Sequence, residues 1–260
     1  MPASNERKDR NVPPRNTVRQ ARASNRPKAF FWILGLIALI GVAALGYVAS
    51  RPKSSTVVAD VADTTNAGPA QGYLIGKVDA PVKIVEFADF ECPSCGGWAT
   101  VTEPDVRSRI INAGLANLTY YDFPLTQHRN TIAASNAAAC ADEQGKFWQM
   151  HDRLFQAQDE WNGEATEQPK PFFKRYAGEA GLDVSKWESC FDARKYQKRI
   201  SANLAEGIRR GVNSTPTFVI GNKLYPGMRT YDELKSLVDS VARTTAAPTS
   251  AASTTPAIKK

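Results

Sequence analysis

Hydrophobic and polar positions divide the chain into segments with different periods. Residues 29–49 form an apolar run of 21 residues without charge or proline. As a helix of about 1.5 Å rise per residue, such a run reaches about 30 Å, the thickness of a bilayer core. Phe30, Phe31, Trp32 and Tyr47 lie near its ends, where aromatic side chains suit the membrane interface. The run predicts a transmembrane anchor, while a cleaved signal peptide, with its usual apolar region of about 7–15 residues, is the alternative.

The pattern of a folded domain begins after this run. Val82–Ala88 is rich in β-branched and aromatic residues, which predicts a buried strand. Pro93 suits the first turn of a helix that we expect to run to about Asn112. A second strand is expected at Leu118–Phe123. Strand, helix and strand in this order imply that the two strands are parallel.

Helical spacing then dominates residues 126–210, before strand character returns. Thr217–Ile220 and Lys223–Tyr225 read as two short strands joined by a tight turn. Thr230 and Glu233 match a capping box at the start of a last amphipathic helix. The expected fold class is α/β, with a helical insertion between the second strand and the final strand pair.

Composition assigns the flanks different roles. Residues 50–70 are rich in Ser, Thr, Ala, Asp and Pro, which predicts a flexible linker, and the low-complexity segment 244–260 predicts a disordered tail. The formal net charge is +7, and residues 1–28 carry most of it. The positive-inside rule therefore places 1–28 in the cytoplasm and residues 71–243, the folded domain, outside it. With its charges nearly balanced, this domain shows no sign of nucleic-acid binding.

The four cysteines carry the candidate chemistry. Cys92 and Cys95 form a C-x-x-C at the junction of a strand and a helix, where the helix N-terminus favours the reactive thiolate. We assign Cys92 as the nucleophile and Cys95 as the resolving thiol. Half a zinc site and an inert bridge are the alternatives, and zinc needs two more ligands at fitting spacing. The remaining soft ligands are single and scattered: His128, Cys140, His151 and Cys190.

Three segments resemble one known family in the same order. Residues 79–95, 142–148 and 211–221 are similar to the active-site region, the helical insertion and the proline loop of DsbA-like thiol–disulfide oxidoreductases, which belong to the thioredoxin superfamily. The resemblance covers about residues 71–243. It implies a thioredoxin-like fold with a helical insertion, an enzyme, and no cofactor or metal, because the cysteines carry the electrons themselves.

The resemblance also implies roles for residues outside the C-x-x-C. Pro216 is expected to be cis beside the cysteine pair, leaving the Thr215 backbone free to pair with an extended substrate; an ordinary proline at a strand start is the alternative. Glu86 matches the buried acid that exchanges a proton with Cys95, unless it is an edge charge that reaches solvent. Ser94 departs from the best-known oxidases, which have histidine there. We therefore expect Cys92 to be less acidic than in the strongest oxidants.

Cys140 and Cys190 lie on apolar helical faces. Some relatives of this family have a disulfide in the insertion, so we expect these two to form a structural bridge; two separate buried thiols are the alternative. His128 and His151 are expected to be packed residues without a redox role.

The expected function is the oxidation of cysteine pairs in exported proteins by an enzyme anchored in the cell membrane. Its expected partners are those proteins, a membrane redox partner that recycles the cysteines, and the lipid bilayer around 29–49. A reductase or isomerase of the same compartment is the first alternative. A non-catalytic assembly factor that uses the fold to hold unfolded chains is the second.

Overall fold

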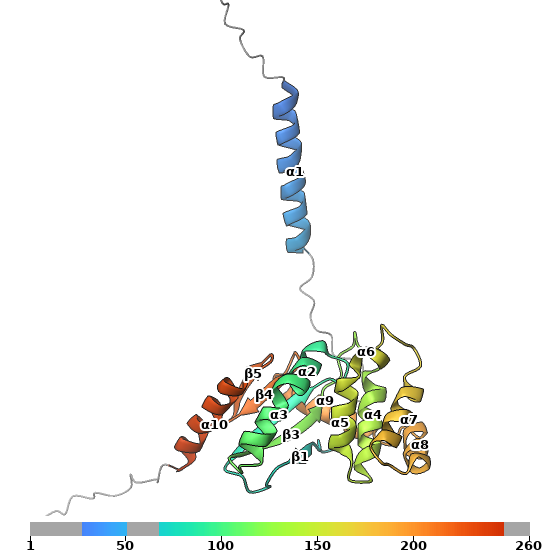
Figure 1. Ribbon diagram of the computed structural model, residues 1–260. Coiled ribbons are helices and arrows are strands. Elements are labelled where there is room, and N and C mark those ends of the chain that lie inside the picture. Colours follow the sequence, from blue (N-terminus) through green and yellow to red (C-terminus); the bar gives the residue numbers. More distant parts are fainter. Residues whose placement is uncertain (1–27, 51–67, 247–260) are drawn as a thin grey trace, which may run out of the picture. The chain divides into compact units, whose positions relative to one another are not determined.

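A computed structural model describes residues 28–50 and 68–246, which belong to two separate compact units (Figure 1). The first contains the helix α1 (Lys28–Ser50), and its described side chains are exposed. A membrane span was expected at 29–49, but no helix in the described part of the chain is both long and apolar enough for one. The predicted basic tail lies outside the described residues except for Lys28, and most of the predicted linker does too.

The second unit is built on a five-stranded sheet with the order β1-β3-β2-β4-β5. The central strand β2 pairs parallel with β3, as predicted, and the other pairs are antiparallel. The first strand was not predicted, because three residues are too few to show a period. The strands are β1 (Tyr73–Ile75), β2 (Val82–Ala88), β3 (Ala116–Asp122), β4 (Thr217–Ile220) and β5 (Lys223–Pro226).

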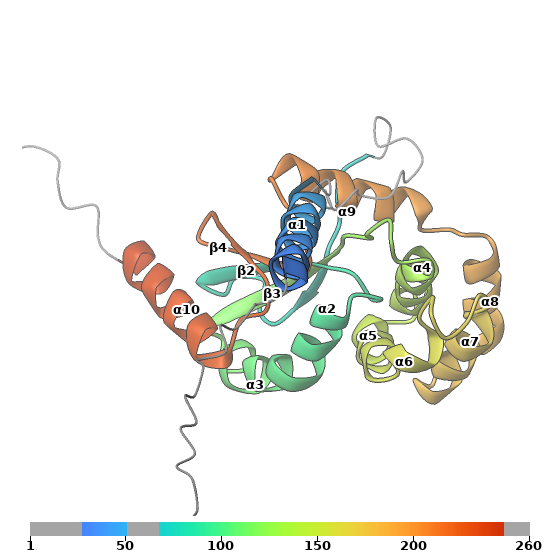
Figure 2. The ribbon, with the colours of Figure 1, turned by 90° about the horizontal axis from the view of Figure 1, so that it is seen from above.

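Helices cover both faces of the sheet, as the view from above shows (Figure 2). On one face, Val82 and Ile84 of β2 pack in one apolar cluster with residues from the helical segment after β2 and from the last helix. That segment comprises α2 (Pro93–Gly97), η2 (Trp98–Thr102), α3 (Glu103–Val106) and η3 (Arg107–Ile111), and the last helix is α10 (Tyr231–Ala246). On the other face, Phe87 of β2 packs against Leu204 of α9 (Gln197–Arg209).

The helical insertion between β3 and β4 forms its own apolar cluster, which extends to the active-site segment through Phe90 and Cys95. Trp161 and Trp187 are fully buried in it. Its helices before α9 are α4 (Thr131–Asp142), α5 (Phe147–Gln156), α6 (Gln158–Trp161), α7 (Lys170–Glu179) and α8 (Val184–Asp192). The expected α/β fold with a helical insertion is thus confirmed.

Two helices differ from the sequence prediction. The helix expected from Pro93 to about Asn112 contains two π-helical turns, η2 and η3. The capping box at Thr230 forms as predicted: the backbone N–H of Thr230 donates to the Glu233 carboxylate at 2.8 Å, and the N–H of Glu233 donates to the Thr230 hydroxyl at 3.2 Å. The helix α10 that follows continues to Ala246, so residues 244–246 belong to it, and the rest of the predicted tail lies outside the described residues.

A disulfide joins α4 to α8 inside the insertion. The Cys140 and Cys190 sulfurs are 2.03 Å apart, and their Cα atoms are 5.8 Å apart. The indole N–H of Trp187 donates to the Ala137 carbonyl at 3.0 Å and links the same two helices. The bridge has the pairing that the family resemblance implied.

Candidate functional site

The C-x-x-C lies where β2 passes into α2. Cys92 is the N-cap residue of α2, with extended backbone angles, and Pro93 occupies the first turn. The Cys92 carbonyl accepts a hydrogen bond from the N–H of Gly96 at 3.0 Å, which begins the helix. Both cysteines are free thiols, with 7% of Cys92 exposed and none of Cys95. The first cysteine therefore keeps a small exposed surface at the helix N-terminus, and the second is fully enclosed.

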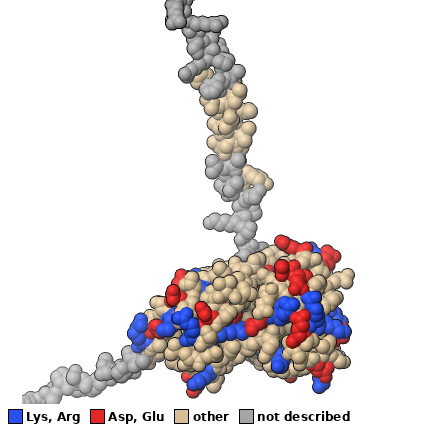
Figure 3. Space-filling model, in the orientation of Figure 1, with Lys and Arg blue, Asp and Glu red and all other residues tan. Residues whose placement is uncertain are grey.

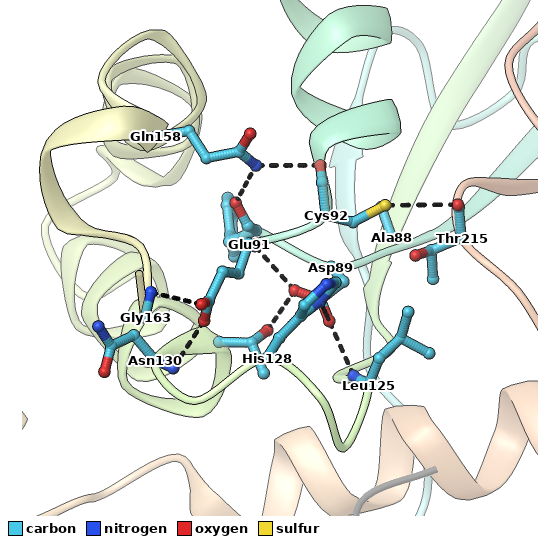
Figure 4. A network of polar contacts seen from close by, with 12 residues as sticks. Ala88, Asp89, Glu91, Cys92, Leu125, His128, Asn130, Gln158, Gly163 and Thr215 are labelled. Carbon is cyan, nitrogen blue, oxygen red and sulfur yellow. Dashed lines mark hydrogen bonds and ion pairs between the residues drawn. The ribbon is translucent and has the colours of Figure 1, made fainter. Parts of the chain in front are cut away.

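The proline loop reaches the cysteine pair from the other end of the chain. Antiparallel pairing sets Thr217 of β4 opposite Phe87 of β2, so the residues before Thr217 lie beside those after Phe87. The Cys92 thiol donates to the Thr215 carbonyl at 3.5 Å (Figure 4). The peptide bond between Thr215 and Pro216 is cis. Sequence positions more than 120 residues apart thus form one site.

The two thiols have opposite acidities. A hydrogen bond from the Cys95 side chain is the main cause that lowers the pKa of Cys92 to about 6. Burial opposes it, while the Thr215 side chain and the Cys95 backbone N–H add to the lowering. Burial is the main cause that raises the pKa of Cys95 well above its usual range. At neutral pH Cys92 is therefore mostly thiolate, and Cys95 keeps its proton.

Asp89 organises the turn before the cysteines (Figure 4). Its buried carboxylate accepts hydrogen bonds from the backbone N–H groups of Glu91 and Leu125 at 2.8 and 2.7 Å, and from the Thr131 hydroxyl at 2.5 Å. His128 Nδ1 lies 2.8 Å from the same carboxylate. Burial is the largest single cause and acts to lower the pKa of His128, but the hydrogen bond to Asp89 and the negative charges around the ring together outweigh it, so the pKa is raised. His128 is packed and hydrogen-bonded, as expected, and its raised pKa favours the charged form beside the site.

Two more polar side chains attach the helical insertion to the active-site turn (Figure 4). The Glu91 carboxylate accepts from the backbone N–H groups of Asn130 and Gly163 at 2.6 and 2.5 Å. Gln158 of α6 donates from Nε2 to the Cys92 carbonyl at 3.0 Å. Glu91 and Gln158 were not among the residues predicted for the site. Asp89 and Glu91 lie directly before the C-x-x-C, and two acidic residues in that position could have predicted a role at the site. Nothing in the sequence indicates a role for Gln158.

Glu86 lies in the core, below the helical segment that begins with the cysteines. Only 1% of the residue is exposed, so the edge-charge alternative is wrong. Burial is the first cause that raises the pKa of Glu86 well above its usual range, and repulsion from Glu103 is the second. Glu86 also acts electrostatically on Cys95 and raises the pKa of that thiol. A negative charge on Glu86 therefore disfavours the thiolate of Cys95, and a Cys95 thiolate disfavours a charged Glu86.

No group of three His, Cys, Asp or Glu side chains in residues 28–50 and 68–246 is arranged to hold a metal ion. His151 has no exposed surface, and its Nδ1 lies 2.8 Å from Asp152. Its ring packs against Phe90 and Trp148, with ring centroids 5.7 and 5.0 Å apart. Each histidine in this part of the chain is thus engaged with a carboxylate.

Known proteins resemble this chain in sequence. "Na(+)/H(+) antiporter NhaA 3" of Salinispora tropica is 33% identical over 173 residues, which are 66% of this chain and 25% of the antiporter. The chain therefore spans about a quarter of that relative. "Probable disulfide bond formation protein D" of Bacillus anthracis is 26% identical over 226 residues, covering 84% of this chain and 97% of the relative.

Solved structures match in fold. The crystal structure of Wolbachia pipientis alpha-DsbA1 superposes with a TM-score of 0.60 at 19% identity, over 67% of this chain and 92% of that one. The profile of the family described as "Thioredoxin" matches residues 70–240, which include both cysteines, the insertion and the proline loop. Because this match covers more than half of the sequence, the chain belongs to the thioredoxin family.

Proposed function

We propose that the chain is a protein disulfide oxidoreductase that oxidises cysteine pairs in exported proteins through a Cys92–Cys95 disulfide. The observation that carries this proposal is the contrast between an acidic, partly accessible thiol at a helix N-terminus and an enclosed, weakly acidic thiol two residues later. The first thiol can attack a disulfide and can leave a mixed disulfide as a thiolate. The second can resolve a mixed disulfide from within the same molecule. The Bacillus relative, named for disulfide bond formation, supports the same class of reaction.

The proposed reaction removes two electrons from the substrate and transfers them to the Cys92–Cys95 disulfide. A substrate thiolate attacks Cys92 of the disulfide, a mixed disulfide forms, and Cys95 leaves as a thiolate. Its raised pKa means that Cys95 takes up a proton, and Glu86, whose pKa is also raised, supplies it. The second substrate thiol loses its proton and attacks the substrate sulfur of the mixed disulfide. The substrate disulfide is released, and the protein keeps a Cys92 thiolate and a Cys95 thiol.

The pKa of Cys92 bears on the direction of electron flow. Stabilising the thiolate stabilises the reduced form, so the disulfide accepts electrons more readily. The value of about 6 is close to the value of about 7 for thioredoxin and well above about 3.5 for DsbA. This acidity agrees with the expectation from Ser94 that Cys92 is less acidic than in the strongest oxidants, so the reduction potential decides between an oxidant and a reductase.

The decisive experiment measures activity and potential in the full-length chain, purified in mild detergent. We expect the oxidised protein to restore activity to reduced, unfolded ribonuclease, and Cys92→Ser to abolish this. We expect a reduction potential between the values of about −120 mV for a strong oxidant and about −270 mV for thioredoxin. A potential at the thioredoxin end would overturn the oxidising direction and favour the reductase or isomerase. Full biological activity in Cys92→Ser would favour the non-catalytic assembly factor.

We also propose that the catalytic domain works outside the cytoplasm, attached to the membrane through residues 29–49. The apolar run after a basic segment supports this, as do the exposed apolar side chains of α1, such as Trp32 and Leu39 at 79% and 70%. A membrane redox partner would then reoxidise the cysteines. Both signs of charge are mixed over the face of the catalytic domain that Figure 3 shows. Recovery of the full-length protein in the alkaline-washed soluble fraction would contradict the anchor.

A further inference from the structure

Three polar side chains of the catalytic domain combine near-complete burial with an unpaired polar atom. Glu86, Glu103 and His151 are each 1% exposed or less. Each has one buried polar atom without a hydrogen-bond partner among the described residues: Glu86 Oε2, Glu103 Oε2 and His151 Nε2. Leaving such an atom unpaired costs about 1–3 kcal/mol. Three of them in neighbouring side chains indicate a function other than stability.

These side chains and Asp152 form a series that leads away from Cys95, linked by electrostatic interactions at its inner end and by measured distances at its outer end. Glu86 acts electrostatically on Cys95 at one end and on Glu103 at the other. Glu103 Oε2 lies 3.9 Å from His151 Nε2. His151 Nδ1 lies 2.8 Å from Asp152 Oδ1. Each side chain in the series is able to bind and release a proton.

The series ends at solvent. Asp152 has 42% of its side chain exposed, and it lines an open cavity of about 300 Å³ together with Arg107. Arg107 donates from Nε to Glu103 at 2.8 Å and from Nη1 and Nη2 to Asp152 at 3.0 and 2.8 Å. It therefore fixes both carboxylates. With Nδ1–H directed at Asp152, the lone pair on Nε2 of a neutral His151 faces Glu103.

We propose that Glu86, Glu103, His151 and Asp152 form a proton path that connects the enclosed Cys95 thiol with the cavity at Arg107. The inference rests on the proposed function and extends it from the buried acid to solvent. The path supplies Glu86 with protons during reduction and removes them during reoxidation. Glu103 and His151 act through Glu86, so they are positioning and relay residues and do not touch the substrate.

The proton balance defines the task of the path. When the Cys92–Cys95 bond breaks, Cys95 leaves as a thiolate and takes the proton of Glu86. Glu86 is then a buried carboxylate close to Glu103 with Arg107 as the countercharge, so it must regain one proton. The relay starts from the Nε2–H form of neutral His151 in the oxidised protein: a proton from solvent enters through Asp152 onto Nδ1, and the Nε2 proton moves to Glu103, which passes a proton to Glu86. His151 is then left with the Nδ1–H that faces Asp152 in the reduced protein, in which both thiols are free. Reoxidation of the cysteines runs the same transfers in reverse.

The test follows the protonation of Glu86 directly in the full-length protein. Rapid mixing of the oxidised protein with dithiothreitol, followed by time-resolved infrared spectroscopy, records the carboxylic acid band that Glu86→Gln removes. Glu103→Gln keeps an oxygen acceptor for Arg107 but carries no proton in the path, and His151→Gln removes the imidazole. Asp122→Asn is the matched control, because Asp122 is another fully buried carboxyl with an unpaired oxygen that lies outside the series.

We expect the Glu86 band to decrease on reduction and then to recover, about tenfold or more slowly in Glu103→Gln and in His151→Gln than in the wild type and in Asp122→Asn. A loss of packing alone would lower the melting temperature without this selective delay. If His151→Gln does not fold, by circular dichroism, Glu103→Gln decides. Equal recovery rates overturn the path, as does a band that does not respond to reduction. Ribonuclease oxidation, measured separately, tests the proposed function, so its loss with intact proton kinetics refutes only that function.

Discussion

The acidity of Cys92 depends on which groups surround the sulfur. Ser94 supplies no charge, so the thiolate relies on hydrogen bonds, above all the one from the Cys95 thiol. Asp89 opposes it, because its negative charge raises the pKa of Cys92. His128 lies against that carboxylate and offsets part of its charge when protonated. A single sulfur atom thus responds to residues from three separate segments.

This dependence predicts different outcomes for two substitutions of the resolving cysteine. Cys95→Ala and Cys95→Ser both remove the second thiol, so both should trap mixed disulfides with substrates. Only the alanine variant loses the side-chain donor to Cys92, so its Cys92 pKa should rise by about one unit or more, while serine should keep much of the lowering. Thiolate absorbance in the ultraviolet as a function of pH measures this. Equal pKa values in the two variants would contradict the assigned role of the hydrogen bond.

Sequence reasoning at this scale succeeded where contacts are local. The C-x-x-C at a helix start follows from Pro93 and the strand before it, and the capping box follows from two residues three apart. The contact of Asp89 with His128 joins residues 39 apart, and it exists only because the chain after β3 returns to the active-site turn. The hydrophobic period within a single helix or strand does not predict that the chain returns to this turn. The same holds for the relation of Glu103 to His151, which are 48 positions apart in the sequence.

At the scale of elements, the insertion is a helical layer with its own apolar core and its own disulfide, Cys140–Cys190. Its helices are short, and several have weak local capping: of its N-caps, Asp183 of α8 accepts side-chain hydrogen bonds, whereas those of α4, α5, α6, α7 and α9 do not. Short helices depend on tertiary packing for their stability. The Cys140–Cys190 bridge therefore stabilises a part of the fold in which the individual helices have little stability of their own.

Removing this bridge should destabilise the domain without changing its redox chemistry. The disulfide closes a loop with a sequence separation of 50, for which chain entropy gives a stabilisation of up to about 4 kcal/mol. The double variant Cys140→Ala, Cys190→Ala should lower the free energy of unfolding by about 2–4 kcal/mol in urea titrations. The reduction potential of the Cys92–Cys95 pair should stay the same within error. A shifted potential would mean that the bridge communicates with the active site.

At the scale of the whole domain, the active site lies between the sheet and the insertion and is held by both. Thr215 reaches it from the sheet side, and Gln158 and Glu91 tie it to the insertion. The pattern of strands and helices predicted this division, because the helical block separates two strand regions. It did not predict the contacts across the junction, which depend on how the two layers pack.

The redox state of the cysteine pair changes how the stability of the whole domain depends on pH. The folded protein lowers the pKa of the Cys92 thiol from 9.0 to about 6, and the oxidised protein has no thiol to titrate. A lowered acid pKa contributes stability that is fully present above the unfolded value and is lost as pH falls through the folded value. The raised pKa of Cys95 contributes in the opposite sense, but it is lost only above pH 9, outside this window.

The free energy of unfolding of the reduced form should therefore rise relative to that of the oxidised form between pH 6 and 9, by about 2 kcal/mol after allowance for the partial exposure of Cys92. Glu86 and His128 are present in both redox forms, so the comparison removes most of their contribution. Denaturant titrations of both forms of the full-length protein across this range measure the difference. A difference that is flat or falls with pH would show that folding does not stabilise the Cys92 thiolate. The acidity assigned to the nucleophile, on which the oxidising direction depends, would then be wrong.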